Sequence, residues 1–437
     1  MDESVIIANS FVLIRLPSST LRVVKMVPNT TIHLGKFGSF FADEIIGKLY
    51  GYTYEIRDDK HVDTIYSSEG LFSSSVVNAD GDVGEDEDQE EGESMEENGN
   101  EEKTPEKELE INTNETTTDD PTVQKLSMSD IEQLKKTEKG ERIIQEMIKS
   151  HGAFEKKSIY SREKYTRRKQ AKFLRRFTPC FLGSSELIEY YMYKDQHRIL
   201  DMTSESLGLI LSLANVHEGG NYIVFDETGG LIAGAMLERM GNEGTILFVH
   251  ENEHANMDVM KFMNFDVEQT NRMVKTINIL QLFHPEEEEV VRTLSPEYLQ
   301  NMKSSRRGQY YRKLERKGEL DTIFKQLNNS DYDGLIMATT LETKLLLDKL
   351  IPALAGSRQL VIYNVSKEPL VETVHDLMAD LRVIAPTMLE TRVRKYQVFP
   401  GRTHPMMTSR SGGGFLVWGT RVLPSAVQAG GKRRRKN

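Results

Sequence analysis

The chain has 437 residues, a single cysteine and a net charge of −11. It contains no run of about 18 apolar residues, so we expect two or three domains and no membrane span. One cysteine, Cys180, excludes an internal disulfide and a cysteine metal cluster, which fits a reducing compartment. The N-terminus lacks a basic start and an apolar core, so we expect no secretory signal.

The negative charge comes from one segment. Residues 80–120 contain 19 Asp or Glu and two Lys, a net charge of −17, so the rest of the chain carries +6. The sequence outside this segment is therefore basic, which favours an acidic partner such as nucleic acid.

Residues 1–77 are predicted to form a small antiparallel β domain. The segments SFVLIRL and TLRVVKMV flank a PSS turn, a pattern typical of a hairpin. The segments TTIHLGKFGSF and YGYTYEI continue the β-rich pattern, with glycines at turns or bulges.

Residues 78–125 are predicted to be a disordered acidic insert. The segment is acidic and poor in aromatic residues, so it cannot bury enough apolar surface to offset the entropy of ordering. We expect a solubilising linker, with an autoinhibitory decoy for the basic surface as the alternative.

Residues 126–176 are predicted to be a basic helical segment. Ser129 and Glu132 have the spacing of a capping box, and the run from Lys156 to Arg176 holds ten Lys or Arg and one Glu. Cations neutralise phosphates, and the interleaved aromatic residues could stack on unpaired bases. The alternative is a solvated helix face with the aromatic side chains packed inward. The predicted RNA contacts of this segment are Lys164, Arg167, Arg168, Lys169 and Lys172.

Residues 177–424 alternate between short apolar strands and helical segments, which predicts a doubly wound α/β sheet. The predicted strands include NYIVFD, GTILFVHE, YDGLIMAT and RQLVIYNV. The predicted helices include SSELIEYYMYK, TSESLGLILSLAN, GLIAGAMLERMG, ANMDVMKFMNF and ETKLLLDKLIPAL. The sheet type is that of Rossmann-like, class I methyltransferases.

The turn after NYIVFD tests whether such a domain could hold a cofactor. Methyltransferases of this architecture carry an acid-x-G-x-G-x-G turn, because the backbone must approach the cofactor closely. With Asp226 as the acid, the glycine positions hold Thr228, Gly230 and Ile232. With Glu227 as the acid, they hold Gly229, Leu231 and Ala233. We therefore expect a degenerate loop that binds no cofactor, made of Asp226, Gly229, Gly230, Leu231 and Ile232.

A second basic segment, TRVRKYQVFPGRTHP, gathers cations near a Pro-Gly turn, where loops can present donors to phosphates or bases. The alternative is that the turn residues only shape the chain and Arg402 pairs with a local carboxylate. The predicted RNA contacts here are Arg394, Lys395, Arg402 and His404.

Other chemistry is not indicated. The sequence has no P-loop, no H-E-x-x-H and no G-x-S-x-G, and its histidines lack metal-ligand spacing, so we expect no catalytic residues and no metal. The basic tail, residues 425–437, has the composition of a nuclear import signal, which predicts a nuclear protein.

Several blocks carry a resemblance to a known family. They are NTTIHLGKFGSF, ILDMTSESLGLILSLANVHEGG, DETGGLIAGAMLERMGNEGTI, YNVSKEPL and YQVFPGRTHPMMTSRSGGGFLVWG. The chain resembles the non-catalytic subunits of the eukaryotic tRNA (adenine-58-N1)-methyltransferase, in their fungal form.

The resemblance implies a pair of paralogues. A catalytic partner subunit binds S-adenosylmethionine, while this subunit supplies tRNA-binding surface and no catalytic activity. It also implies a heterotetramer with two copies of each subunit, and 1-methyladenosine in the T-loop of tRNA as the product. Two alternatives remain: a self-sufficient RNA methyltransferase with an unusual loop around Gly229 and Gly230, and an RNA-binding translation or RNP scaffold.

Overall fold

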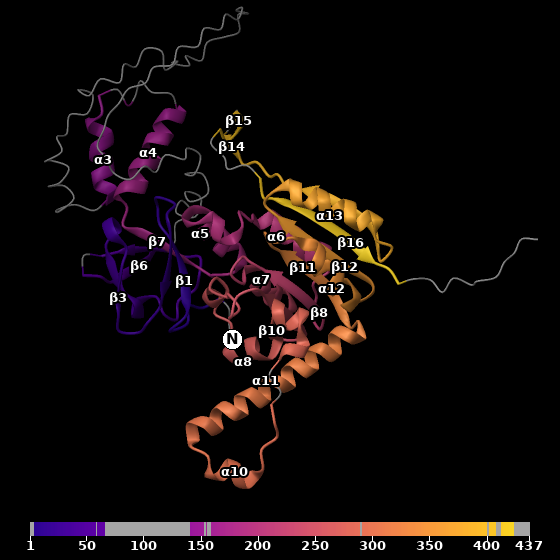
Figure 1. The fold of residues 1–437 in the computed structure, drawn as a ribbon. Helices are drawn as coiled ribbons and strands as arrows, with labels where there is room; N and C mark the ends of the chain where they lie inside the picture. The colour runs from indigo at the N-terminus through magenta and orange to yellow at the C-terminus, as the bar shows by residue number, and fades with distance from the viewer. Residues whose placement is uncertain are drawn as a thin grey trace, which may run out of the picture. The chain divides into compact units, whose positions relative to one another are not determined.

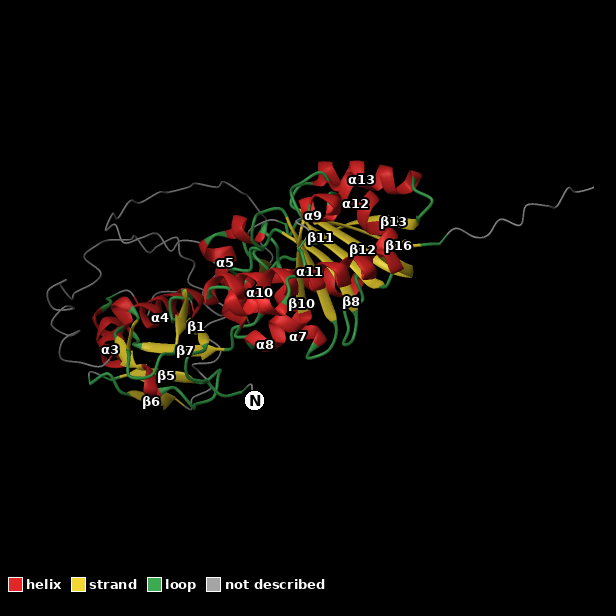
Figure 2. Ribbon diagram, turned by 60° about the horizontal axis from the view of Figure 1, so that its bottom comes forward, coloured by secondary structure: helices red, strands yellow, loops and turns green. Residues whose placement is uncertain are grey.

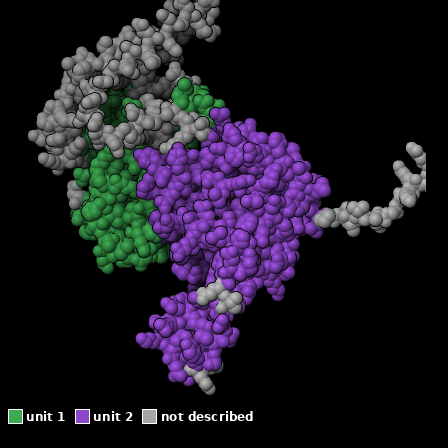
Figure 3. All heavy atoms as spheres, viewed as in Figure 1, with its two compact units in different colours: residues 1–181, 394–410 green, residues 182–393, 411–437 purple. Residues whose placement is uncertain are grey.

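The computed structural model describes residues 4–57, 59–65, 140–152, 154, 159–288, 291–399, 402–407 and 412–423. The predicted acidic insert, the capping box at Ser129 and the basic tail lie outside the described residues. Contacts divide the chain into two compact units (Figure 3). Unit 1 is residues 1–181 with 394–410, and unit 2 is residues 182–393 with 411–437. No helix within the described ranges is long and apolar enough to cross a membrane.

Unit 1 is built on an antiparallel five-stranded sheet of order β2-β1-β7-β5-β6. The predicted hairpin of the first two strands is confirmed, with Phe11 opposite Lys25. The core is mostly aliphatic and includes the rings of Phe40 and Phe177, which stack with centroids 4.3 Å apart. The strands of unit 1's two N-terminal sheets are β1 (Phe11–Arg15), β2 (Leu21–Lys25), β3 (Thr31–His33), β4 (Ser39–Phe41), β5 (Thr53–Ile56), β6 (Val62–Ile65) and β7 (Arg176–Cys180).

The position of β7 corrects the predicted domain boundary. The α/β domain was expected to start at residue 177, but that residue lies inside β7, which pairs with β1 and β5 of unit 1. Phe177 and Pro179 are both buried, and Phe177 belongs to the core of unit 1. The boundary therefore lies at residue 182.

Unit 1 also contains two packed helices and a second hairpin. Helix α3 (Gly140–Ser150) buries Ile143, Ile144 and Met147, the apolar stripe expected of an amphipathic helix. Helix α4 (Ile159–Phe173) packs against α3 and confirms the predicted helical character of the basic segment. The hairpin of β14 (Tyr396–Phe399) and β15 (Arg402–Pro405) groups with this unit, although the prediction placed its residues in the α/β domain.

Unit 2 contains a seven-stranded sheet of order β10-β9-β8-β11-β12-β16-β13. The pairs from β10 to β12 are parallel, and β16 is antiparallel to both of its neighbours. This order confirms the predicted doubly wound, class I methyltransferase-type sheet. The strands are β8 (Asn221–Asp226), β9 (Thr245–His250), β10 (Val274–Asn278), β11 (Tyr332–Ala338), β12 (Leu354–Asn364), β13 (Val383–Glu390) and β16 (Phe415–Arg421).

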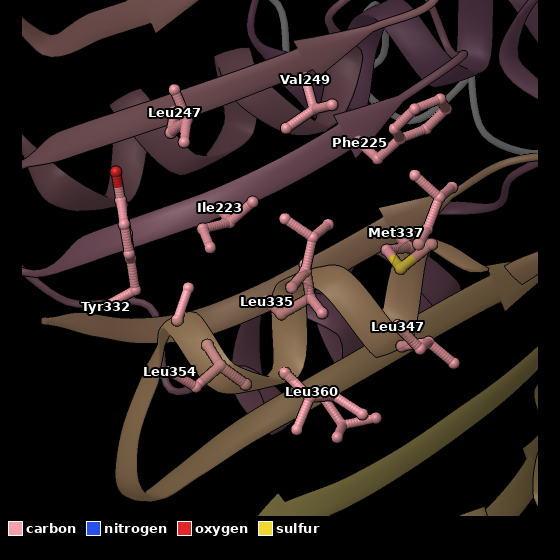
Figure 4. Close-up of a cluster of buried hydrophobic side chains, with 14 of the residues drawn as sticks. Ile223, Phe225, Leu247, Val249, Tyr332, Leu335, Met337, Leu347, Leu354 and Leu360 are labelled. Atoms are coloured by element: carbon pink, nitrogen blue, oxygen red, sulfur yellow. The ribbon is translucent and has the colours of Figure 1, made fainter. Parts of the chain in front are cut away.

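Helices cover both faces of this sheet (Figures 1 and 2). Alternate strand residues such as Ile223, Leu247 and Leu335 join a core with α11, α12 and α13 (Figure 4), and α6 and α7 contact the strands as well. Burial on both faces explains the near-continuous apolar strands that the sequence shows. The helices of unit 2 are α5 (Ser184–Lys194), α6 (Ser204–Leu213), α7 (Leu231–Met240), α8 (Val267–Met273), α9 (Ile279–Phe283), α10 (Pro296–Asn301), α11 (Ser304–Asn329), α12 (Thr343–Leu350) and α13 (Lys367–Ala379).

One predicted helix of unit 2 is wrong. The segment ANMDVMKFMNF forms only a 3-10 turn, η8 (Met260–Met263), preceded by irregular chain. Its apolar residues are used in the tertiary structure to cover the glycine loop described below, rather than to line one side of a regular helix.

Candidate functional site

The loop after β8 lies where a doubly wound sheet usually binds its ligand. The chain proceeds from β8 to β9 and β10 on one side and returns to β11 on the other, so the order reverses between β8 and β11. Ligands of such sheets bind at the carboxyl ends of the strands, at this switch point. Asp226 is the last residue of β8 and lies beside Ala338 of β11.

The Asp226 side chain is hydrogen-bonded to the loop and to the start of α7. Its carboxylate accepts hydrogen bonds from the backbone N–H of Thr228 at 2.7 Å, Ile232 at 3.1 Å and Ala233 at 3.3 Å, and from the Thr228 hydroxyl. These donors include first-turn N–H groups of α7, which have no partner within the helix. Burial raises the pKa of the Asp226 carboxyl, and these hydrogen bonds act in the opposite direction.

The two glycines of the loop are covered by protein. Gly229 and Gly230 have φ angles of +72° and +82°, the left-handed region that favours glycine. A Cβ built on Gly229 would lie 2.8 Å from Cγ2 of Val259, and one on Gly230 would lie 3.2 Å from Cα of Met257. The Gly229 carbonyl also accepts a hydrogen bond from the Val259 N–H at 2.9 Å. The segment from Met257 to Val259 therefore packs directly against the glycine loop.

Methionine side chains extend this cover onto α7. A Cβ on Gly234 would meet the side chains of Met263 and Met260, both of which are buried. Leu231 and Ile232 are fully buried in the first turn of α7. Leu231 and Ile232 were predicted as part of the degenerate loop, whereas the sequence did not predict the cover by the segment from Met257 to Met263. The only sequence signal was the density of methionines in ANMDVMKFM.

The switch point itself is bridged by Glu227. Its carboxylate accepts hydrogen bonds from the Thr339 hydroxyl, from the Thr340 N–H at 2.9 Å and from the Thr340 hydroxyl at 2.8 Å. The side chain of Asn364 donates to the Thr339 carbonyl at 2.9 Å, which ties β12 to the same loop. The carboxyl ends of β8, β11 and β12 are thus joined by hydrogen bonds through Glu227 and Asn364.

The neighbouring strand end provides a test of this packing. His250, the last residue of β9, is 9% exposed and donates from Nδ1 to the Asn252 carbonyl at 2.7 Å. Burial lowers the pKa of the His250 imidazole below its ordinary value of 6.5. The unfolded chain therefore binds this proton more readily, and the free energy of unfolding should fall as the pH decreases below 6.5.

We expect His250→Gln to reduce the loss of Tm between pH 7 and pH 5, because an amide cannot titrate there. Thermal unfolding at both pH values measures this. The matched control is His375→Gln on an exposed face of α13, which should leave the loss of Tm unchanged. If wild type and His250→Gln lost the same Tm between pH 7 and pH 5, the prediction that burial lowers the pKa of His250 would be contradicted.

The predicted RNA contacts of the basic segment lie on α4. Arg168 and Lys172 are exposed and one turn apart, while Lys169 is half-buried with Nζ 5.1 Å from the ring centroid of Tyr165. Lys164 and Arg167 lie on the same helix, but their side chains are outside the description. A continuous stretch of positive charge on a helix face is suited to phosphates.

Two aromatic residues of this segment, Tyr165 and Phe177, have packing roles. Tyr165 contacts the rings of His151 and Phe154, with centroids 5.1 Å and 5.7 Å away. Phe177 lies in the core of unit 1. The predicted base stacking therefore does not apply to Phe177, because its ring is 1% exposed.

The second predicted segment forms the β14–β15 hairpin. Arg394 and Lys395 are exposed, and Arg394 donates to the Met406 carbonyl at 3.4 Å. His404 is exposed and donates from Nδ1 to the Pro405 carbonyl at 2.9 Å. Arg402 begins β15, but its side chain and the Pro-Gly turn lie outside the description. The structure thus brings both predicted basic segments into unit 1, although they are far apart in sequence.

A family model described as Gcd10p family matches residues 5–305. The chain belongs to the Gcd10p family. It is 41% identical to a Debaryomyces hansenii protein named "tRNA (adenine(58)-N(1))-methyltransferase non-catalytic subunit TRM6", covering 99% of this chain and 90% of that relative. A Schizosaccharomyces pombe relative with the same name is 31% identical, covering 97% of this chain and 93% of its own length.

These relatives confirm the family that the sequence predicted, and their names support the expectation of a catalytically silent subunit. Among solved structures, the tRNA (m1A58) methyltransferase TrmI of Aquifex aeolicus aligns with a TM-score of 0.45 and 10% identity, covering 96% of this chain and 100% of that one. The strand order of unit 2, rather than this likeness, defines the fold. Within the described part of this Gcd10p-family chain, no group of three or more His, Cys, Asp or Glu could hold a metal ion.

Proposed function

We propose that this chain is the non-catalytic, tRNA-binding subunit of a tRNA (adenine-58-N1)-methyltransferase. The main observation behind the proposal is that residues of this chain pack over the switch point of unit 2, the place where such sheets usually bind a ligand. The sheet has the strand order of a methyltransferase. Its glycine loop contacts Val259 and Met257, and Glu227 links its strand ends by hydrogen bonds. We infer that it keeps the scaffold of an enzyme without room for the cofactor.

The partner is a paralogous catalytic subunit that holds S-adenosylmethionine. We propose a heterotetramer with two copies of each subunit, located in the nucleus. The names of the relatives support the complex, because a non-catalytic subunit of a methyltransferase needs a catalytic one.

The proposed role of this chain is to hold tRNA while the partner acts on it. A base in a folded RNA must leave its stack before an enzyme can modify it. Binding of the backbone by α4 and the β14–β15 hairpin of unit 1 would orient the T-loop so that the partner's pocket can take the extruded adenine. This division of labour needs only phosphate contacts from this chain.

We expect the full chain alone to bind no S-adenosylmethionine and to transfer no methyl group to tRNA. Isothermal titration with the cofactor measures the first, and transfer of labelled methyl groups to an unmodified tRNA transcript measures the second. The same transfer assay on the catalytic partner alone, and on both subunits co-expressed, should show activity only in the mixture.

Each result bears on one of the alternatives. Saturable cofactor binding or activity from this chain alone would overturn the proposal in favour of a self-sufficient methyltransferase. Full activity from the partner alone would overturn it in favour of an RNA-binding scaffold with no role in methylation.

A further inference from the structure

Unit 2 carries an extension that the proposed function does not use. Helix α11 is 26 residues long, but only Leu320 and Ile323, in its second half, are buried. Its first half and α10 project from the body of unit 2 (Figures 1 and 3). We call residues 296–317 the α11 arm.

The α11 arm is strongly basic. Residues 303–317 contain seven Lys or Arg and one acid, Glu315. Two pairs of like charge, Arg312 with Arg316 and Lys313 with Lys317, lie one helical turn apart. Such pairs destabilise an isolated helix, because like charges at this spacing repel. An anionic ligand would remove this repulsion.

These four cations form one wall of a groove. The groove has a volume of about 740 Å³ and is also lined by Pro285, Val291, Leu320 and Phe324. The acids that line it are Glu288 and Asp321, so cations outnumber acids in the groove. Apolar side chains next to cations lower the local dielectric and strengthen attraction to an anion.

Several of the arm's cations are available to a ligand. Arg316 is engaged, since it donates to the Thr276 carbonyl at 2.8 Å and pairs with Glu319 at 3.3 Å. Within the described ranges, Arg306, Arg312 and Lys317 make no ion pair. From Arg306 to Lys317 the helix advances by 11 steps, about 16.5 Å at 1.5 Å per residue.

The arm also has exposed tyrosines. Tyr311 and Tyr298 are 52% and 59% exposed. The Tyr310 hydroxyl instead accepts a hydrogen bond from the Leu294 N–H at 3.2 Å, which ties α11 to the chain that precedes α10. Aromatic rings beside cations suit single-stranded nucleic acid, in which a base can stack while its phosphates are neutralised.

We propose that the α11 arm is a second RNA-binding surface, on unit 2, which binds the phosphodiester backbone through Arg306, Arg312 and Lys317. This rests on the proposed function, because it assigns a further contact to a tRNA-binding subunit. The ligand is a polyanionic strand, since the cations are spread along the helix instead of converging on one point.

The test uses the full chain in complex with its catalytic partner and an unmodified tRNA transcript. The variant combines Arg306→Glu, Arg312→Glu and Lys317→Glu. We expect tRNA affinity to fall at least tenfold at low salt, and the slope of log K against log salt to decrease by about two to three, since each lost phosphate contact contributes about 0.7 to 0.9.

The matched control combines Lys325→Glu, Lys344→Glu and Lys367→Glu, three exposed residues of unit 2 outside the arm. It makes the same change in net charge and should keep the wild-type slope. Unchanged affinity in the arm variant would overturn this inference while leaving the proposed function intact. Loss of the catalytic partner on purification of the arm variant, with tRNA affinity of the chain unchanged, would overturn it in favour of a subunit interface. A wild-type complex that binds no tRNA would overturn both.

Discussion

Gly229→Ala should lower the Tm of unit 2 by about 4 to 20 °C. A side chain in the left-handed region costs about 1–2 kcal/mol, and overpacking of a filled site costs about 1–3 kcal/mol more. The new Cβ would lie 2.8 Å from Val259, whose backbone is held by a hydrogen bond to the Gly229 carbonyl. For a unit of this size, each kcal/mol corresponds to about 2–4 °C. Thermal unfolding followed by circular dichroism measures the change.

Gly219→Ala is the matched control for this prediction. Gly219 has a φ of +78°, but a Cβ there meets nothing within 4 Å. It should show the conformational cost alone, about 1–2 kcal/mol. If both variants lost the same stability, Val259 would be free to move away from the new side chain. This result would contradict the tight packing of Val259 against Gly229.

Charge reversal on unit 1 should weaken tRNA binding by the complex on the order of 100-fold at low salt, if four phosphate contacts are lost. The variant combines Arg168→Glu and Lys172→Glu on α4 with Arg394→Glu and Lys395→Glu before β14. All four side chains are exposed, so the change should act on binding rather than on folding. Filter binding of a labelled tRNA transcript across a range of salt concentrations measures both the affinity and its salt dependence.

The control for this variant reverses four exposed lysines of unit 2: Lys325, Lys344, Lys349 and Lys367. It changes the net charge by the same amount, so long-range attraction is matched between the two. Equal loss of affinity in both would mean that net charge alone, and not these two segments, determines tRNA binding. Reversal of the α4 pair and of the Arg394–Lys395 pair separately then shows how each segment contributes.

Local patterns in the sequence were sufficient for part of the secondary structure. The hairpin of β1 and β2, the strand–helix alternation of unit 2 and the turn at Gly229 and Gly230 follow from alternation, periodicity and the conformational freedom of glycine. Where the predicted helix at ANMDVMKFMNF is wrong, the local pattern was overridden, because its methionines pack over the glycine loop.

By itself, the sequence determined that the cofactor fingerprint is degenerate, that the chain outside its acidic segment is basic, and which family it resembles. Only the tertiary structure decided that β7 completes the sheet of unit 1, that α4 and the β14–β15 hairpin belong to one unit, and that Val259 and Glu227 close the switch point. The physical reason is that residue periodicity reports which face of an element is apolar, but not which distant surface will cover it. The cover of Gly229 comes from 30 residues further along the chain, and its shape is set by packing rather than by local propensity.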